Sequence, residues 1–334
     1  MAVSMRDVAQ YAGVSQRTVS NVVNDFVHVR PETRAKVLAA IQELGYEPNS
    51  SARSLRTGRT GQIRLLLPDL TSSYFAQLAE DVVVEAEQRS LTVLIELTHG
   101  RRDIELRGLA GGGSQRTDGA IMFVTALEAA DFQHRRPEFP VVAVGSSPPT
   151  NDIDSTGLPN YDAALAMVRH LTGLGRRRIA IIGTRGLAAR GGTQRYDGYR
   201  AALREAGLPV HPDLAAVTTA WSRAEGQRAM SVLLALPARP DAVFAMNDEL
   251  AIGALREALR QGVAVPEEIS VSGFDDIDEA AYTTPPLTTV AVNIQGLASA
   301  AVELVLRRTA APDALPRRVV ADFYLQIRKS TSSV

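Results

Sequence analysis

From residue 61 onward, the sequence alternates short apolar runs with longer stretches of helical periodicity. The runs are rich in Val, Ile and Ala, and the stretches between them repeat apolar residues every three or four positions. Strands and helices that alternate in this way form parallel sheets covered by helices. The expected strands are Ile63–Leu67, Thr92–Leu97, Gly119–Val124, Val141–Val144, Ile179–Ile182, Ala242–Ala245, Ile269–Ser272 and Thr288–Val292, and the expected helices lie near 74–89, 161–173, 194–206, 223–235, 248–261 and 295–308.

The length of this alternating region predicts two lobes. The chain has 334 residues, and about 270 of them lie in this region, which is more than a single hydrophobic core usually serves. The predicted fold class is therefore α/β, with doubly wound parallel sheets. The first sixty residues follow a different pattern and predict a smaller, all-α unit.

The composition is typical of a cytoplasmic protein. The chain has no Cys, so disulfides and thiolate metal sites are excluded and a reducing compartment fits. The segment Met1–Met5 lacks the charged and apolar regions of a secretory signal. No apolar run approaches the ~18 residues of a membrane helix, so we expect no membrane association.

The net charge of −1 conceals a basic first segment. Residues 1–60 carry eight Lys and Arg against five Asp and Glu, or +3, while the remainder carries 28 against 32, or −4. Between Glu47 and Asp69 there are four Arg and no acid. A positive charge of this size is also common on solvated surfaces, so it permits a nucleic-acid partner without establishing one.

The first segment predicts three short helices. Ser4 followed by Asp7 is typical of a helix N-terminus, and Gly13 can adopt the positive φ of a tight turn. A second helix then buries Val19, and a third begins near Pro31. This order predicts a helix-turn-helix with a supporting helix, although a three-helix cap without DNA would show similar spacing. The positions expected to face its core are Met5, Val8, Ala9, Ala12, Val19, Val22, Val23, Val37, Ile41 and Leu44.

A series of short motifs then makes the interpretation specific. They are Arg6-Asp7-Val8-Ala9, Ala12-Gly13-Val14-Ser15, Thr18-Val19-Ser20, Val23-Asn24, Thr33-Arg34, Leu44-Gly45-Tyr46, Pro48-Asn49 and Ala52-Arg53-Ser54-Leu55-Arg56. In this order and spacing they resemble the headpiece of the lactose-repressor (LacI/GalR) family. The resemblance implies a homodimer, possibly a tetramer, that binds a double-stranded DNA operator.

The resemblance also implies roles for individual headpiece residues. Gln16, Arg17 and Asn21 occupy the base-reading positions of the second helix, and their side chains can pair with guanine or adenine. The family usually has Arg where this chain has Asn21, so the operator sequence of a relative does not transfer. Polar side chains suited to phosphate contacts surround these three positions. They are Thr18, Ser20, Asn24 and Arg34.

Residues 49–60 form a polar, basic linker whose single large apolar residue is Leu55. Composition alone predicts a flexible tether. The resemblance implies instead a hinge helix in which Leu55, flanked by Ala52 and Arg53, inserts between base pairs of the minor groove. Apolar side chains that unstack and kink DNA act in this way.

Further along the chain, the resemblance continues to about residue 307 and implies a fold of the periplasmic-binding-protein type. Two doubly wound lobes then flank a cleft, and the chain crosses between them more than once. The expected domains are a headpiece at 1–48, a hinge at 49–60 and an effector-binding core at 61–334. The expected core divides into lobe one at 61–159 and 291–319 and lobe two at 160–290 and 320–334.

Polar and aromatic residues follow several expected strands, where ligands of open α/β sheets collect. Aromatic faces beside charged and amide groups are typical of a sugar site, although each residue alone fits a helix cap or a loop equally well. The candidates are Tyr74, Phe75, Thr125, Arg195, Trp221, Asn247 and Asp275. Motifs that match the family support Arg195, Asn247 and Asp275 as effector-binding residues. They are Arg195-Tyr196-Asp197-Gly198-Tyr199, Asn247-Asp248-Glu249-Leu250-Ala251 and Val271-Ser272-Gly273-Phe274-Asp275-Asp276.

Two departures from the family border this expected cleft. Ser72-Ser73-Tyr74-Phe75 replaces the usual Asn-Pro-Phe-Phe, and Pro159-Asn160 replaces the usual Asp-Asn. The identity of the effector therefore cannot be borrowed from a relative. We expect a mono- or disaccharide, and a nucleoside or purine effector is the alternative.

The sequence shows no motif for phosphate binding, metal binding or catalysis. The glycine-rich segments lack the Lys-Ser/Thr ending of a phosphate-binding loop, and the five His show no metal-ligand spacing. We expect neither cofactor, metal nor catalytic residue. Two other classes stay open: a transport-type sugar-binding protein, which has no use for residues 1–60, and a sugar-modifying enzyme, which needs a nucleophile or paired carboxylates.

Overall fold

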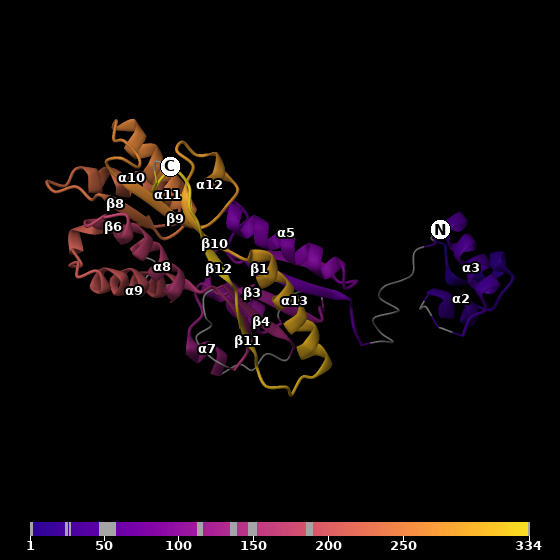
Figure 1. Ribbon diagram of the computed structural model, residues 1–334. Helices are drawn as coiled ribbons and strands as arrows, with labels where there is room; N and C mark the ends of the chain where they lie inside the picture. Colours follow the sequence, from indigo (N-terminus) through magenta and orange to yellow (C-terminus); the bar gives the residue numbers. More distant parts are fainter. Residues whose placement is uncertain are drawn as a thin grey trace. The chain divides into compact units, whose positions relative to one another are not determined.

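The computed structural model divides the chain into two compact units, Met1–Thr60 and Gly61–Val334. Figure 1 traces both units in sequence colours. The structure describes residues 3–23, 26, 28–46, 58–111, 116–133, 139–145, 152–184 and 190–332.

The first unit holds the three expected helices, α1 (Met5–Ala12), α2 (Gln16–Val23) and α3 (Pro31–Leu44). Helix α1 begins with a capping box, in which the backbone N–H of Ser4 donates to Asp7 Oδ2 at 2.8 Å and the side chain of Ser4 accepts from Asp7 N. Gly13 follows with φ 63°, the left-handed conformation that glycine adopts without strain. The sharp turn between α1 and α2 therefore depends on this glycine.

Three Val side chains form the centre of this unit. Val8, Val19 and Val37 come from the three different helices, and each is fully buried. Ala9, Val22, Ala40 and Tyr46 complete the buried set. The other positions expected in this core, Met5, Ala12, Val23, Ile41 and Leu44, are only partly buried. A bundle of three short helices has too little interior to cover them all.

In the second unit, the described strands form two six-stranded sheets, here called sheet A and sheet B. Sheet A has the order β11-β5-β4-β3-β1-β2, and all its pairings are parallel. Its strands are β1 (Gln62–Leu67), β2 (Thr92–Leu97), β3 (Gly119–Phe123), β4 (Val141–Gly145), β5 (Asp154–Gly157) and β11 (Arg318–Val320).

Sheet B has the order β12-β10-β9-β8-β6-β7, and only its edge strand β12 is antiparallel. Its strands are β6 (Ile179–Ile182), β7 (Ala215–Ala216), β8 (Ala242–Ala245), β9 (Ser270–Asp275), β10 (Thr288–Val292) and β12 (Phe323–Gln326). The helices of this unit are α5 (Ser73–Glu87), α6 (Arg102–Leu109), α7 (Ala129–Gln133), α8 (Asn160–Gly173), α9 (Arg190–Glu205), α10 (Arg223–Leu234), α11 (Asp248–Arg260), α12 (Glu279–Tyr282) and α13 (Ile294–Ala310). These two parallel sheets confirm the predicted α/β class.

The inner strands of sheet A are buried on both faces because they alternate their side chains between two helical layers. Ile63 and Leu65 belong to the large core that includes residues of α5 and α13. Leu66 and Met122 point to the opposite face, where they pack with Leu109 of α6. This arrangement explains why β1 lacks the alternation of a half-exposed strand.

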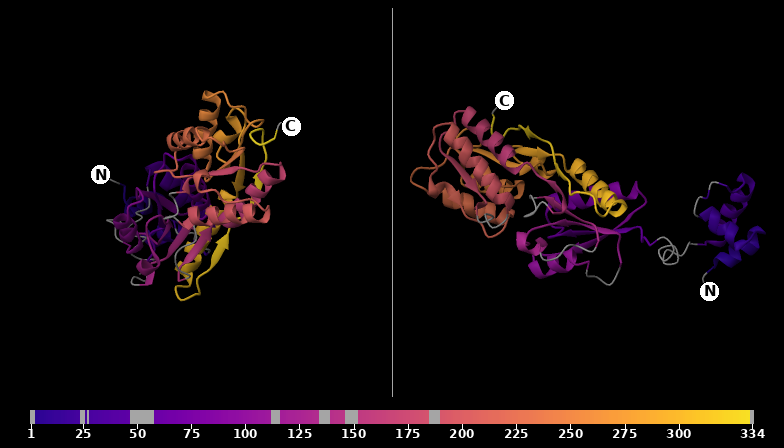
Figure 2. Two further views of the ribbon diagram at one scale, coloured as in Figure 1. Left: turned by 90° about the vertical axis from the view of Figure 1, so that its left-hand side faces the viewer. Right: turned by 90° about the horizontal axis from the view of Figure 1, so that it is seen from below.

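The described chain crosses between the two sheets three times, after β5, after β10 and after β11. Main-chain hydrogen bonds tie these crossing segments together, because Ala321 N donates to Gly157 O at 2.9 Å and Asn293 N to Asp322 O at 3.1 Å. The C-terminal segment, yellow in Figure 2, consequently runs through both lobes. Each lobe is therefore assembled from separate parts of the sequence.

The expected strands all appear near the predicted positions, but the structure adds four for which no apolar run was identified. These are β5, β7, β11 and β12, together with the helices α6, α7 and α12. The case of β5 is clear, because its residues Asp154, Ser155 and Thr156 are polar yet buried. Arg307 and Arg308 pair with Asp154 and compensate its charge. A search for apolar runs cannot find such a strand.

Candidate functional site

Arg195 lies at the centre of a polar cluster at the carboxyl ends of the sheet B strands. It extends from α9, and its side chain is 4% exposed. Its Nε donates to Asn160 Oδ1 at 2.8 Å, and its Nη1 donates to the carbonyl of Met246. The guanidinium lies 3.6 Å from the ring centroid of Phe274. A buried cation is tolerated here because acceptors and an aromatic face replace its water.

Asp275 is the counter-charge of this cluster. Its Oδ1 lies 3.7 Å from Arg195 Nη2, and its backbone has φ 114°, a conformation that side-chain-bearing residues rarely adopt. Burial raises the pKa of Asp275 to about 7, although Arg195 opposes the shift. Burial in turn lowers the pKa of Arg195, while Asp275 acts against that change. Desolvation therefore outweighs the ion pair for both groups.

Asn247 and Asp248 begin α11 beside this pair. Asn247 is the N-cap of the helix, since its Oδ1 accepts from Leu250 N at 3.0 Å, and its amide N–H₂ group is the part left to donate to a ligand. Asp248 is fully buried and accepts from Thr289 Oγ1 at 2.6 Å. Burial, followed by repulsion from Asp275, raises the pKa of Asp248 well above its ordinary value. Asp248 thus has a structural position behind the site.

Trp221 lies next to the guanidinium of Arg195. The centroid of its ring is 5.2 Å from Cζ of Arg195. Its indole Nε1 donates to the carbonyl of Gly183 at 3.2 Å, which holds the ring in place. Trp221 follows the short strand β7, which ends at Ala216. Trp221 therefore sits on a loop that is anchored by its own side chain.

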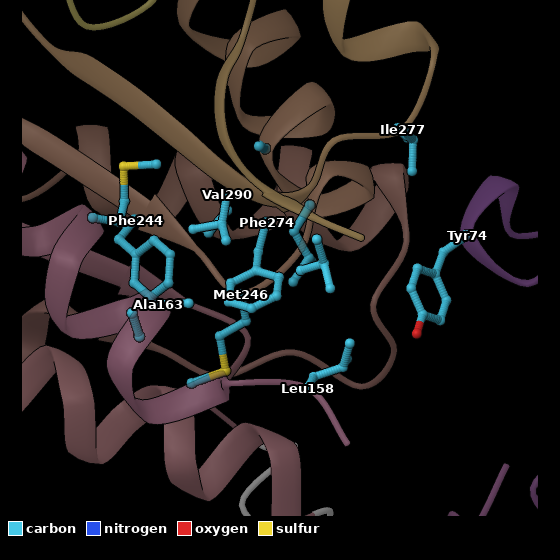
Figure 3. Close-up of a cluster of buried hydrophobic side chains, with 14 of the residues drawn as sticks. Tyr74, Leu158, Ala163, Phe244, Met246, Phe274, Ile277 and Val290 are labelled. Carbon is cyan, nitrogen blue, oxygen red and sulfur yellow. The ribbon is translucent and has the colours of Figure 1, made fainter. Parts of the chain in front are cut away.

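Three aromatic rings lie on the lobe-one side. Tyr74 and Phe75 of α5 pack edge to face with Phe123 at the end of β3, at centroid distances of 6.2 and 4.8 Å. In Figure 3, Tyr74 lies across from Phe274 and Met246 of the other lobe. Among the described residues, the buried hydroxyl of Tyr74 has no hydrogen-bond partner, and burial, with Asp275 adding to it, raises the pKa of Tyr74. Its ring is enclosed by its neighbours, so the face is less available for stacking than we expected.

Thr125 takes part in a separate network. Its backbone N–H donates to Glu105 Oε1 at 3.1 Å, and its hydroxyl donates to the same oxygen. Glu105 is fully buried and also accepts from Ala126 N at 3.0 Å and Leu127 N at 3.1 Å. Thr125 therefore helps to hold the loop after β3, and its hydroxyl is already engaged.

The structure thus brings the predicted residues Arg195, Asn247, Asp275 and Trp221 to one end of sheet B, with Tyr74 opposite. Groups outside the predicted set complete the site: the side chains of Asn160, Phe123 and Phe274 and the backbone carbonyl of Met246. The unusual Pro159-Asn160 pair was a usable signal for Asn160. Phe123 and Phe274 are strand residues, and nothing in a strand pattern separates a site wall from a core.

In the first unit, α2 presents its polar side chains away from the bundle. Gln16 and Arg17 are exposed and Asn21 is partly exposed, while Val19 and Val22 fill the interior. Thr18 Oγ1 lies 2.9 Å from Ser15 Oγ, within the cap of the helix. Ser20 is partly buried.

Arg34 of α3 donates from Nη2 to the carbonyl of Phe26 at 2.9 Å and so ties α3 to the segment before it. That bond gives Arg34 a structural role beside the phosphate contact expected of it. Asn24, Ala52, Arg53 and Leu55 lie outside the described residues.

Comparison with known proteins identifies the family. Residues 4–49 match the model for bacterial regulatory proteins of the lacI family, and residues 168–331 match the model for periplasmic binding protein-like domains. The Ribose operon repressor of Escherichia coli is 34% identical over 321 residues, which cover 95% of this chain and 96% of that protein. The chain belongs to the lacI family. It is therefore a DNA-binding transcriptional regulator and not an enzyme.

Solved structures agree with this assignment. The Lac repressor dimer bound to operator and an anti-inducer matches this lacI-family regulator with a TM-score of 0.87 and 28% identity, over 99% of each chain. A LacI-family regulator from Sanguibacter keddieii is 39% identical, with a TM-score of 0.75, over 82% of this chain and 99% of its own. A complex of the regulator CelR with cellobiose matches with a TM-score of 0.72 and 29% identity, over 98% and 99%.

The lacI-family regulator also has a cavity of about 530 Å³ outside the cluster at Arg195. Its walls are the starts of β4 and β5, the end of α13 and the loop before β11. The buried charges there pair with each other, since Arg308 Nε donates to Asp154 Oδ2 at 2.8 Å. None of the residues predicted to bind the effector lines this cavity. Within the described ranges, no group of three His, Asp or Glu could hold a metal ion, and no helix is long and apolar enough to span a membrane.

Proposed function

We propose that this regulator is a cytoplasmic repressor that binds a palindromic operator as a dimer and changes its DNA affinity when a carbohydrate binds between its two lobes. Residues 1–48 bind DNA, 49–60 form the hinge and 61–334 form the effector-binding core. The printed names of its relatives support this, since they include a Ribose operon repressor, a Lac repressor dimer on its operator and a cellobiose complex.

In this proposal, α2 reads bases in the major groove. Arg17 can bond guanine through two donors, and Gln16 or Asn21 can pair with adenine. Exposure of Gln16 and Arg17 on one side of α2 supports these roles. Thr18, Ser20, Asn24 and Arg34 contact phosphates, and Leu55 between Ala52 and Arg53 is the minor-groove wedge.

The carbohydrate assignment rests on one observation, the buried pair of Arg195 and Asp275. Their nearest nitrogen and oxygen are 3.7 Å apart, which is longer than a good hydrogen bond, so each can still serve a ligand hydroxyl. Asn247 adds a donor, and Trp221 or Phe75 can cover an apolar sugar face, with the enclosed ring of Tyr74 packed against Phe75. Thr125 is at most an indirect contributor, since Glu105 holds its hydroxyl.

Trp221 is the only Trp of the chain and reports directly on this site. Titration with D-ribose, D-cellobiose and D-glucose should change its fluorescence emission, and one sugar should saturate the signal. The variant Asp275→Ala should abolish the change and retain DNA binding. Asp278→Ala, which alters an exposed carboxylate three residues away, should titrate like the parent. A response to adenosine or guanosine but to no sugar would replace the carbohydrate with a purine effector.

A further inference from the structure

One side-chain hydrogen bond joins the two lobes at the rim of the site. Ser73, the first residue of α5, donates from Oγ to Glu279 Oε1 at 2.8 Å. Glu279 is the first residue of α12, which lies beside the start of α5 in Figure 1. The two residues are 206 positions apart in sequence, and their helices follow strands of different sheets, β1 of sheet A and β9 of sheet B. This bond is therefore a contact between lobes and not within one.

The acceptor is held in position by its own lobe. Arg223 Nη2 donates to the same Oε1 of Glu279 at 2.7 Å, and Arg223 Nε donates to Glu249 Oε2 at 2.6 Å. Glu249 is largely buried, with 11% of its side chain exposed, so it anchors the arginine. Arg223 is bidentate to Glu249, with Nη2 also donating to Glu249 Oε1 at 3.2 Å, and it restrains Glu279 through one charge-assisted hydrogen bond.

The donor is held as well. Asp69 Oδ1 accepts from Thr71 N and Ser72 N, both at 2.9 Å, which fixes the loop that enters α5. Tyr74, the next residue after Ser73, is packed into the aromatic cluster. Ser73 stands where the family resemblance has Pro, which carries no hydroxyl. A chain with Pro at this position could not form the bond.

We propose that Ser73, Glu279 and Arg223 form a latch that holds the lobes in this arrangement before an effector binds. The inference rests on the proposed function, because lobe position matters only if the cleft between the lobes binds the effector. Two arrangements of the lobes typically differ in free energy by only a few kcal/mol. One hydrogen bond to a charged acceptor therefore changes the ratio of the two populations about tenfold. The latch thereby prearranges the site for its ligand and raises the apparent affinity by a similar factor.

The test uses the full-length protein without ligand or DNA. Acrylamide quenching of Trp221 fluorescence measures solvent access to the cleft, where this ring lies beside Arg195. Ser73→Ala removes the donor and should increase the quenching constant. Ser73→Thr keeps a hydroxyl and should behave like the parent. Ser72→Ala is the matched control, since the side chain of Ser72 makes no capping hydrogen bond.

Two further measurements separate the possible outcomes. Glu279→Gln weakens the acceptor of the Ser73 hydrogen bond and should increase quenching as well. Thermal melts show whether each variant is folded. Equal quenching in Ser73→Ala, Glu279→Gln and the parent would overturn the latch, even if a sugar binds. With D-ribose as the probe, Ser73→Ala should bind about tenfold more weakly than the parent. Increased quenching in a protein that binds no sugar would uphold the latch and refute the proposed effector.

Discussion

Arg195 illustrates how a single buried charge can be neutralised and still be available to a ligand. Two of its nitrogens are bonded within the protein, to Asn160 and to the carbonyl of Met246. The third nitrogen faces Asp275 at 3.7 Å, beyond hydrogen-bond length. A ligand hydroxyl placed between these two groups can accept from one and donate to the other. The pair is therefore better suited to bind a polar ligand than to stabilise the empty fold.

Asp275 should make the stability of the core depend on pH. Its folded-state pKa is about 7 and its ordinary value is 3.8, so between these pH values the folded protein keeps a proton that the unfolded chain releases. The free energy of unfolding should therefore fall as pH rises from about 4 to 7, by up to about 1.4 kcal/mol per pH unit for this proton. Asp248, whose pKa is also raised, acts in the same direction. Urea unfolding measured across this range gives the slope.

The variant Asp275→Asn should show a shallower slope than the parent. Asp276→Asn provides the control, since Asp276 is the neighbouring acid and pairs with Arg328 at 2.8 Å. If Asp275→Asn and the parent lose stability equally between pH 4 and 7, Asp275 is ionised throughout this range. Attraction to Arg195 then outweighs burial in setting the pKa of Asp275.

At the scale of the elements, α10 and α11 pack unusually closely because each has a glycine at their crossing. A side chain at Gly226 would collide with the backbone of Leu250, and one at Gly253 would collide with the carbonyl of Arg223. Neither obstacle is a flexible side chain, so a helix would have to move. This close packing supports the position of Asn247 and Asp248 at the start of α11.

Gly226→Ala should consequently destabilise the core by about 3 kcal/mol or more, at the upper end of the cost of overpacking. Gly173→Ala is the matched control, because Gly173 ends α8 with no atom within 4 Å of a new Cβ. That change should be neutral or stabilising by up to about 1 kcal/mol, as alanine favours helix. Chemical denaturation measures both, and equal stability of the two variants would contradict the close-packing argument.

The elements that could be predicted are those whose sequence carries a periodic apolar signal. Strands β2, β6, β8 and β10 have the predicted bounds for that reason. The short strand β7 and the polar strand β5 carry no such signal. Burial of Asp154 in β5 depends on Arg307 and Arg308, which lie about 150 residues away. The local sequence around Asp154 cannot reveal these partners, because only the tertiary structure brings the two Arg side chains to its carboxylate.

The site was predictable to the extent that its residues follow strands or match family motifs. Arg195, Asn247 and Asp275 meet as the topology of a parallel sheet requires. Thr125 also follows a strand, yet its hydroxyl bonds Glu105, an acid on α6 that the sequence analysis did not single out. The hydrogen bond of Ser73 to Glu279 depends on how the two lobes meet, which no single segment encodes.

For the whole molecule, the proposed mode of DNA binding predicts a steep dependence on salt and on assembly. Two headpieces, each with the charge of +3 carried by residues 1–60, should displace counterions from both half-sites. With a palindrome selected from a random library, affinity should fall by roughly a thousandfold between about 50 and 200 mM salt. Fluorescence anisotropy of labelled DNA gives this slope, and analytical ultracentrifugation gives the stoichiometry. A single chain that binds the palindrome as tightly as two chains do would contradict binding as a dimer.

The three crossings between the sheets also set the order in which a growing chain can fold. Sheet A receives its edge strand β11 only after nearly all of sheet B has been made, since Arg318 follows β10 in the sequence. Domains of nascent chains fold as they leave the ribosome, and here the three-helix unit is complete long before either lobe. Every newly made molecule therefore has a complete three-helix unit for roughly ten seconds or more before the second unit can be finished.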